Sequence, residues 1–206
     1  MNNSWNKLIY KGWAPIYDRI FNSGPFSKVR DILFSEIHFR PGDRVLFVGA
    51  GTGADIDRLP YDLLEITAID YSEDMLEKAK EKFKGSSITF FKMDAQQLEF
   101  DDGSFDYVIG SLILSVVPDS TKAFGEMIRV CRKEGLVVVF DKFAQPGKGQ
   151  SFVTKALRHV IKLLGTDIGV SFEEICQKEK ARVRLISDEG VMLGNTYRRI
   201  LLQKVC

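Results

Sequence analysis

Long apolar runs and cysteine are scarce in this chain of 206 residues. The most apolar stretch, residues 107–118, is too short to span a bilayer and contains glycine and serine. The first 13 residues lack the charged start, apolar middle and cleavage site of a secretory signal. The three cysteines, Cys131, Cys176 and Cys206, are widely spaced and suit free thiols in a reducing compartment. We therefore expect a cytoplasmic protein without a disulfide framework.

Histidine is also scarce, and neither sign of charge is in clear excess. The two histidines, His38 and His159, have no Cys, Asp or Glu at metal-ligand spacing, so we expect no metal site. The formal net charge of +1 provides no overall attraction for nucleic acid, and we expect no nucleic-acid partner. The sequence leaves the oligomeric state open.

Short apolar strands alternate with helices through the middle of the chain. Residues 5–39 have apolar positions at helical spacing, and residues 22–25 divide them into two predicted helices. Further helices are predicted from Ser72 to Phe83, with Ser72 as the cap, and from Asp119 or Ser120 to Gly135, with Cys131 on the apolar face. The predicted strands are Val45–Val48, Ile66–Ile69, Ile88–Phe91, Tyr107–Ile113 and Leu136–Phe140. This alternation predicts a doubly wound parallel sheet of the α/β class.

The end of the chain has a different order of elements. Two predicted helices, at about 151–164 and 172–180, precede two predicted strands, Arg182–Ile186 and Tyr197–Gln203. The link at Gly190–Asn195 is too short for a helical crossover, so the two strands should form an antiparallel hairpin. The sequence thus predicts a mostly parallel seven-stranded sheet that ends in an antiparallel β-hairpin.

A glycine-rich loop follows the first predicted strand. Val45–Val48 continues into Gly49-Ala50-Gly51-Thr52-Gly53 and then into a predicted helix. Glycine lets a ligand approach the main-chain amides, and a helix amino terminus favours negative charge. Asp70 ends the second strand, 21 positions after Gly49, and can accept hydrogen bonds from both hydroxyls of a ribose. A tight turn and an ordinary strand-end aspartate are the structural alternatives. The glycine loop and Asp70, found together at this spacing, favour an adenosine-containing ligand.

A third candidate segment follows the third predicted strand. In Met93-Asp94-Ala95-Gln96-Gln97-Leu98, Asp94 can accept a hydrogen bond from an adenine amino group, and Ala95 can offer its backbone amide. The turn Asp101–Asp106 then enters the fourth strand, which is followed by Gly110-Ser111-Leu112.

With these segments in this order, the chain resembles the class I methyltransferases that use S-adenosylmethionine, over residues 10–145. The resemblance is strongest to the ubiquinone/menaquinone-type branch, which includes bacterial phospholipid N-methyltransferases. It is carried further by Trp13-Ala14-Pro15-Ile16-Tyr17-Asp18, Ser115–Asp119 and Met127–Gly135. The family fold is Rossmann-like. The resemblance implies one domain over residues 1–206, with a helical cap (1–40), a cofactor-binding core (43–145), and helices plus the hairpin (146–206).

The resemblance also implies a role for each candidate residue toward S-adenosylmethionine. The loop glycines would line the methionine part, Asp70 would hold the ribose, and the segment after the third strand would flank the adenine. Ser111 would lie near the methyl donor, and Tyr17 would close over the cofactor. The complete implied set is Tyr17, Gly49, Ala50, Gly51, Gly53, Asp70, Tyr71, Met75, Asp94, Ala95 and Ser111.

One position departs from the family pattern, and it leaves alternatives open. The family usually has Glu or Asp two residues before the first loop glycine, where this chain has Phe47. A non-catalytic binding module is therefore one alternative. A nicotinamide dehydrogenase is another, because Gly49-x-Gly51-x-x-Ala54 matches the looser dinucleotide pattern. The preceding helices, the lack of a Tyr-x-x-x-Lys pair and the final strand pair favour the methyltransferase.

The methyl acceptor is expected to be hydrophobic or lipid-like. The family builds its acceptor site from the amino-terminal helices and the segment after the fifth strand, which here supply Tyr10, Trp13, Tyr17, Phe21 and Phe143. The amine of a phospholipid headgroup fits this set, and a quinol precursor or a soluble small molecule is the alternative. Asp141, just past the fifth predicted strand, is a weak catalytic candidate that could orient an amine or act as a base, or could simply be solvated.

The predicted helix at 151–164 has two interpretations. It has an apolar sector, and its charged residues are all basic: Lys155, Arg158 and Lys162, preceded by Lys148. Such a helix can lie on the anionic inner face of a membrane, which would make the protein peripheral to it. Alternatively, its apolar side covers the sheet and its basic residues are solvated.

Overall fold

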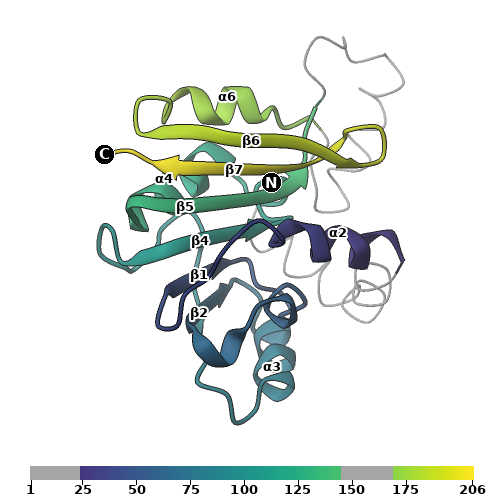
Figure 1. The fold of residues 1–206 in the computed structure, drawn as a ribbon, viewed down its shortest axis with the longest axis vertical. Helices are drawn as coiled ribbons and strands as arrows, with labels where there is room; N and C mark the ends of the chain where they lie inside the picture. The colour runs from purple at the N-terminus through teal and green to yellow at the C-terminus, as the bar shows by residue number, and fades with distance from the viewer. Residues whose placement is uncertain (1–23, 145–168) are drawn as a thin grey trace.

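The computed structural model describes residues 24–144 and 169–206, so the predicted helices at 5–21 and 151–164 lie outside the described residues. The described residues form one seven-stranded sheet in the order β3-β2-β1-β4-β5-β7-β6. Figure 1 shows β2, β1, β4, β5, β7 and β6 side by side in this order. The strands are β1 (Arg44–Val48), β2 (Glu65–Asp70), β3 (Thr89–Lys92), β4 (Phe105–Ser111), β5 (Cys131–Lys142), β6 (Val183–Met192) and β7 (Tyr197–Lys204). The helices are α2 (Pro25–Leu33), α3 (Glu73–Lys82), α4 (Ser120–Val130) and α6 (Phe172–Gln177). None of these described helices is long and apolar enough to cross a membrane.

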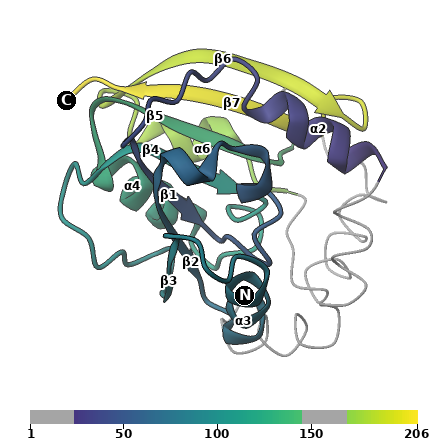
Figure 2. The same cartoon turned by 60° about the horizontal axis from the view of Figure 1, so that its bottom comes forward.

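The direction of the strands confirms the predicted sheet. β1 pairs in parallel with β2 and β4, β2 pairs in parallel with β3, and β4 with β5. β7 is antiparallel to both β5 and β6, so the sheet ends in the expected hairpin. Because β1 to β5 run in one direction, their carboxyl ends meet at the same edge of the sheet (Figure 2).

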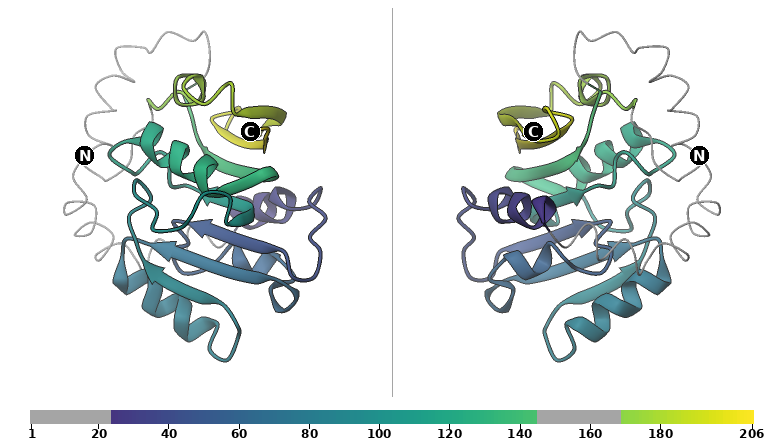
Figure 3. Two further views of the ribbon diagram at one scale, coloured as in Figure 1. Left: turned by 90° about the vertical axis from the view of Figure 1, so that its left-hand side faces the viewer. Right: turned by 90° about the vertical axis from the view of Figure 1, so that its right-hand side faces the viewer.

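Both faces of the sheet are packed against apolar clusters. Leu46 and Val48 of β1 belong to a cluster with residues of α4 and α6. Val45 and Phe47 point to the opposite face, into a cluster with residues of α2. Figure 3 shows α4 and α2 on the two sides of the sheet. Since alternate residues of β1 are buried on opposite faces, the strand reads as a continuous apolar run.

The helix predicted after the glycine loop is not present. The connection from β1 to β2 contains only two short 3-10 helices, η1 (Ile56–Arg58) and η2 (Tyr61–Leu63). Pro60 lies between them, and Leu59 before it is extended, with φ −107° and ψ 157°. A proline has no N–H and disfavours the helical conformation of the preceding residue. The glycine loop therefore does not open onto a helix amino terminus, and that part of the prediction is wrong.

The predicted end of the next helix is also wrong. α4 ends at Val130 rather than at Gly135, and Cys131 is the first residue of β5, paired with Phe105. The Nζ atom of Lys204 donates hydrogen bonds to the carbonyls of Arg129 (3.1 Å) and Cys131 (2.8 Å). Burial raises the pKa of the Cys131 thiol to about 12, so it stays protonated.

The helix caps differ from one another. Asp119 caps α4 as expected, because its side chain accepts a hydrogen bond from the amide of Lys122. Ser72 occupies the cap position of α3, but its side chain makes no capping hydrogen bond. Its backbone amide instead donates to Asp70 at 2.8 Å.

Replacing Lys204 by methionine should destabilise the transition from α4 to β5. The change keeps the buried stem and removes the Lys204 donor from both carbonyls; the carbonyl of Arg129 keeps the amide of Gly103 at 3.0 Å, whereas the buried carbonyl of Cys131 loses its side-chain donor. This should lower the free energy of unfolding by about 1–3 kcal/mol. Urea unfolding of the variant against the wild type measures this. Lys133→Met, the same change at an exposed position, is the control. Equal losses in the two variants would contradict the role given to Lys204.

Candidate functional site

The glycine loop is attached to the end of β2 by three backbone amides. The N–H groups of Gly49 and Ala50 both donate to the carbonyl of Ile69 at 2.9 Å. The N–H of Gly51 donates to Oδ2 of Asp70 at 2.8 Å. The structure thus brings together the loop and the aspartate that the sequence paired by spacing alone.

Asp70 also holds the turn that begins α3. Its Oδ1 atom accepts the amide of Ser72, while Oδ2 accepts the amide of Gly51. Burial raises the pKa of this carboxyl group, and the hydrogen bonds to Ser72, Gly51 and Tyr71 oppose that increase. A carboxylate has about four lone-pair sites, so beside these three amides it can still accept a hydrogen bond from a hydroxyl group of a ligand.

The three loop glycines have different surroundings. All have positive φ angles: 73° at Gly49, 55° at Gly51 and 78° at Gly53. A Cβ atom at Gly49 would lie 2.7 Å from Ile113, and one at Gly53 would lie 2.5 Å from the ring of Phe83. A Cβ atom at Gly51 would meet no atom within 4 Å. Gly49 and Gly53 are therefore required by packing, whereas Gly51 leaves space where a ligand can approach the backbone.

The residues after β4 form the next part of the same edge. Ser111 ends β4, and its buried Oγ atom has no hydrogen-bond partner among the described residues. Leu112 has a positive φ of 54°, which ends the strand two residues earlier than predicted. Its amide donates to the carbonyl of Phe140 at 2.7 Å. A buried hydroxyl without a partner is a group that a ligand can satisfy.

Asp141 lies within β5 rather than beyond it, and it is fully buried, so the expectation of a solvated aspartate past the strand is wrong. Its Oδ2 atom accepts the amide of Ser115 at 3.0 Å, and Oδ1 accepts the amide of Lys142 at 2.8 Å. Burial raises the pKa of the carboxyl group, against the effect of these hydrogen bonds. Asp141 therefore attaches the segment after β4 to β5.

Asp94 and Ala95 follow β3 at the other end of this edge. The amide of Met93 donates to the carbonyl of Asp70 at 3.1 Å, which places the two strand ends side by side. Oδ1 of Asp94 accepts the backbone amide of Gln96 at 2.9 Å, and Ala95 is 5% exposed.

The remaining predicted residues lie in mixed environments. Tyr71, next to Asp70, is 42% exposed, whereas Met75 on α3 is buried. Tyr17 lies outside the described residues. Phe47, which stands where the family usually has a carboxylate, is 2% exposed in the apolar cluster with α2. Within residues 24–144 and 169–206, no group of three His, Cys, Asp or Glu side chains could hold a metal ion.

Three residues of the site were not indicated by the sequence. Ser72, Gln96 and Ser115 all contribute backbone amides to carboxylates at strand ends. The amides of Ser72 and Gln96 reach an aspartate two residues earlier, a local turn that the residue types Asp-x-Ser and Asp-x-Gln permit. The amide of Ser115 reaches a carboxylate 26 residues away, for which no local pattern exists.

Comparisons with known proteins identify relatives across this region. Residues 46–139 match the protein family described as "Methyltransferase domain". A phosphatidylethanolamine N-methyltransferase of Cereibacter sphaeroides is 36% identical over 179 residues, which are 84% of this chain and 86% of that protein. A demethylmenaquinone methyltransferase of Renibacterium salmoninarum is 35% identical over 139 residues, 66% of this chain and 57% of that protein.

Solved structures show the same fold. A phosphoethanolamine N-methyltransferase 2 of Haemonchus contortus, in complex with S-adenosyl-L-methionine, superposes with a TM-score of 0.74 at 18% identity, over 92% of this chain and 56% of that chain. A putative sarcosine dimethylglycine methyltransferase of Galdieria sulphuraria has a TM-score of 0.73 at 15% identity, over 87% of this chain and 86% of that chain.

Gly51→Ala should weaken S-adenosylmethionine binding beyond its effect on stability. The new methyl group would occupy the open space at Gly51, and the positive φ adds about 1–2 kcal/mol of strain. Gly85→Ala is the matched control, because Gly85 also has a positive φ and open space, at the far end of α3. We expect similar losses in urea unfolding but weaker cofactor binding by calorimetry in Gly51→Ala alone. Unchanged binding there would place the cofactor elsewhere.

The buried carboxyl group of Asp141 should make stability depend on pH. Its folded pKa is raised, so the folded state binds the proton more tightly than the unfolded state. The free energy of unfolding, relative to Asp141→Asn, should therefore fall as pH rises above the unfolded pKa of about 3.9, by at most about 1.4 kcal/mol per pH unit. The fall should stop above the folded pKa. Urea unfolding of both proteins between pH 4 and 8 tests this, and a difference that grows with pH would contradict it.

Proposed function

Since this chain belongs to the class I S-adenosylmethionine-dependent methyltransferases, we propose that it methylates the amine of a phospholipid headgroup. S-adenosylmethionine is the cofactor of the family. The acceptor is proposed from one observation: the match to the phosphatidylethanolamine N-methyltransferase extends over 84% of this chain and 86% of the relative. The match to the demethylmenaquinone methyltransferase covers only 66% and 57%. Agreement over nearly the whole length includes segments outside the cofactor core, and these are the segments that select an acceptor.

We place the cofactor along the carboxyl ends of β3, β2, β1 and β4. The residues present fit it, because Gly51 leaves space at the backbone and the buried Oγ of Ser111 has no partner among the described residues. In this placement Asp70 accepts a ribose hydroxyl and Asp94 accepts the adenine amino group. The apolar Phe47 provides no carboxylate for the methionyl ammonium group, so in this placement backbone carbonyls of the loop accept from that group.

The chemistry requires little of the protein beyond orientation. The cofactor supplies an electrophilic methyl group on a sulfonium, and proximity and alignment with the acceptor provide most of the rate. A neutral acceptor nitrogen forms the new N–C bond while the C–S bond breaks, and the nitrogen then releases a proton to solvent. Asp141 already accepts two backbone amides, so its role here is to hold Ser115 and the segment after β4 against β5.

A quinol precursor or a soluble small molecule remains the alternative acceptor, and a cofactor-binding module without catalysis is the alternative to an enzyme. The family match removes the nicotinamide dehydrogenase from consideration. We further propose that the whole chain acts as one domain in the cytoplasm, and that residues 151–164, outside the described residues, bring it to anionic lipid.

The test is transfer of labelled methyl groups from S-adenosylmethionine to phosphatidylethanolamine in vesicles. Lipid should be methylated faster on anionic than on neutral vesicles, and salt should reduce the difference. The rate should rise with pH until the amine is deprotonated, since only the neutral amine attacks. Demethylmenaquinone and soluble phosphoethanolamine are the comparison acceptors. Transfer to either of these without lipid methylation would reject the phospholipid, and no transfer with intact cofactor binding would favour the module.

A further inference from the structure

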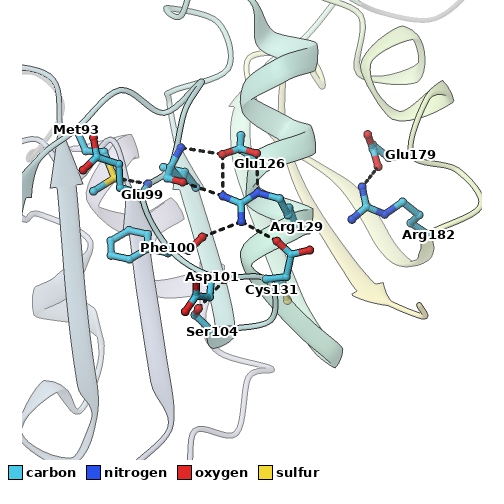
Figure 4. Close-up of polar contacts among 12 residues, drawn as sticks. Met93, Glu99, Phe100, Asp101, Ser104, Glu126, Arg129, Cys131, Glu179 and Arg182 are labelled. Atoms are coloured by element: carbon cyan, nitrogen blue, oxygen red, sulfur yellow. Dashed lines mark hydrogen bonds and ion pairs between the residues drawn. The ribbon is translucent and has the colours of Figure 1, made fainter.

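The segment that carries Asp94 has no regular secondary structure. Residues 93–104 connect β3 to β4 through turns, so their own backbone does not determine where Asp94 lies. Helix α4 contacts this segment near both of its own ends. Figure 4 shows the contact near the carboxyl end of α4, centred on Arg129.

Arg129 uses all five of its N–H groups there. Its Nε donates to Oε1 of Glu126 at 2.7 Å, and Nη2 donates to Oε2 of Glu126 at 2.9 Å. Nη2 also donates to the carbonyl of Leu98 at 2.8 Å. Nη1 donates to the carbonyl of Phe100 and to Oδ1 of Asp102, both at 2.7 Å. Since a guanidinium has five N–H donors in a rigid plane, these contacts fix its position relative to the segment.

Glu126 completes the arrangement by contacting the same segment. Its Oε2 atom accepts the amide of Leu98 at 2.7 Å, so both polar backbone groups of Leu98 are bound to the Arg129–Glu126 pair. The two side chains are 26% and 20% exposed. The hydrogen bond from Arg129 lowers the pKa of Glu126, and the partners of Arg129 raise its pKa, so the pair remains ionised at neutral pH.

The start of α4 holds the segment closer to Asp94. The amide of Asp119 donates to Oε1 of Gln96 at 2.9 Å. Gln96 in turn donates to the carboxylate of Asp94 through its backbone amide and through Nε2, both at 2.9 Å. Ala95 and Leu98 are buried in the cluster that contains the apolar residues of α4. The carboxylate of Asp94 therefore lies where α4 places it.

We propose that Arg129, bound to Glu126, is a positioning residue for the adenine end of the cofactor. It sets the position of residues 94–98 and thereby the direction in which Asp94 accepts the adenine amino group. The inference rests on the cofactor placement proposed above. A residue with only a structural role would affect the binding of every nucleoside equally, whereas a positioning residue affects the contact to the amino group.

The test compares two nucleosides that differ only at this contact. S-adenosylhomocysteine has the 6-amino group, and the 6-deamino analogue, with unsubstituted purine as its base, has a hydrogen atom there and keeps N1 as an acceptor. The wild type should bind the first more tightly by roughly ten- to hundredfold, the effect of one hydrogen bond to a charged group. In Arg129→Gln the ratio should fall to within about threefold of unity, with little change for the 6-deamino analogue. Arg129→Lys keeps the charge without the planar five-donor group, so it should lose most of the ratio too.

Arg132→Gln is the matched control. Arg132 lies three residues further, is exposed, and pairs with Asp106 rather than with the segment. Arg132→Gln should keep the wild-type ratio of affinities, measured by calorimetry, and the thermal stability of the wild type. If Arg129→Gln does not fold, Arg129→Lys and Glu126→Gln decide. A wild-type ratio in these folded variants, or an equal loss in Arg132→Gln, overturns the inference. A wild type that binds neither nucleoside refutes the proposed cofactor site itself, and one that binds both equally refutes only the role of Asp94.

Discussion

Two buried carboxylates at strand ends, Asp70 and Asp141, hold the loops of the candidate site by accepting backbone amides. Asp70 joins the glycine loop to the start of α3, and Asp141 joins the segment after β4 to β5. Burial raises the pKa of both groups, so each carboxylate is kept only at an energetic cost that its hydrogen bonds offset in part. The loops in turn have amides that would otherwise be unsatisfied. Each partner therefore requires the other.

The segment after β3 is also held by side chains that bind its backbone, but there the side chains form an ion pair. There the segment presents carbonyls as well as amides, and the ion pair of Arg129 and Glu126 supplies both donors and acceptors. Because α4 packs against the sheet through a buried apolar face, this ion pair is anchored to the core. The edge of the sheet is thus organised by side chains that contact backbone, and the proposed ligand contacts rest on that organisation.

Local patterns predicted most of the fold. Strands such as Val45–Val48 and Tyr197–Gln203 were recognised because apolar runs between turn residues have few other stable arrangements. The prediction failed where local preference was weak or contested. Pro60 prevented a helix after the glycine loop, and the long-range pairing of Cys131 with Phe105 ended α4 before Gly135. The first failure had a local signal in the sequence, and the second had none.

The sequence by itself determined the alternation of elements, the hairpin at the end and the pairing of the glycine loop with Asp70, since spacing along the chain expresses each of these. Only the tertiary structure decided that Asp141 is buried in β5 with Ser115, that Gly51 alone among the loop glycines leaves open space, and that Arg129 reaches the segment of Asp94. These contacts join residues far apart in the chain. Their geometry depends on how strands and helices pack, which no local pattern of residues contains.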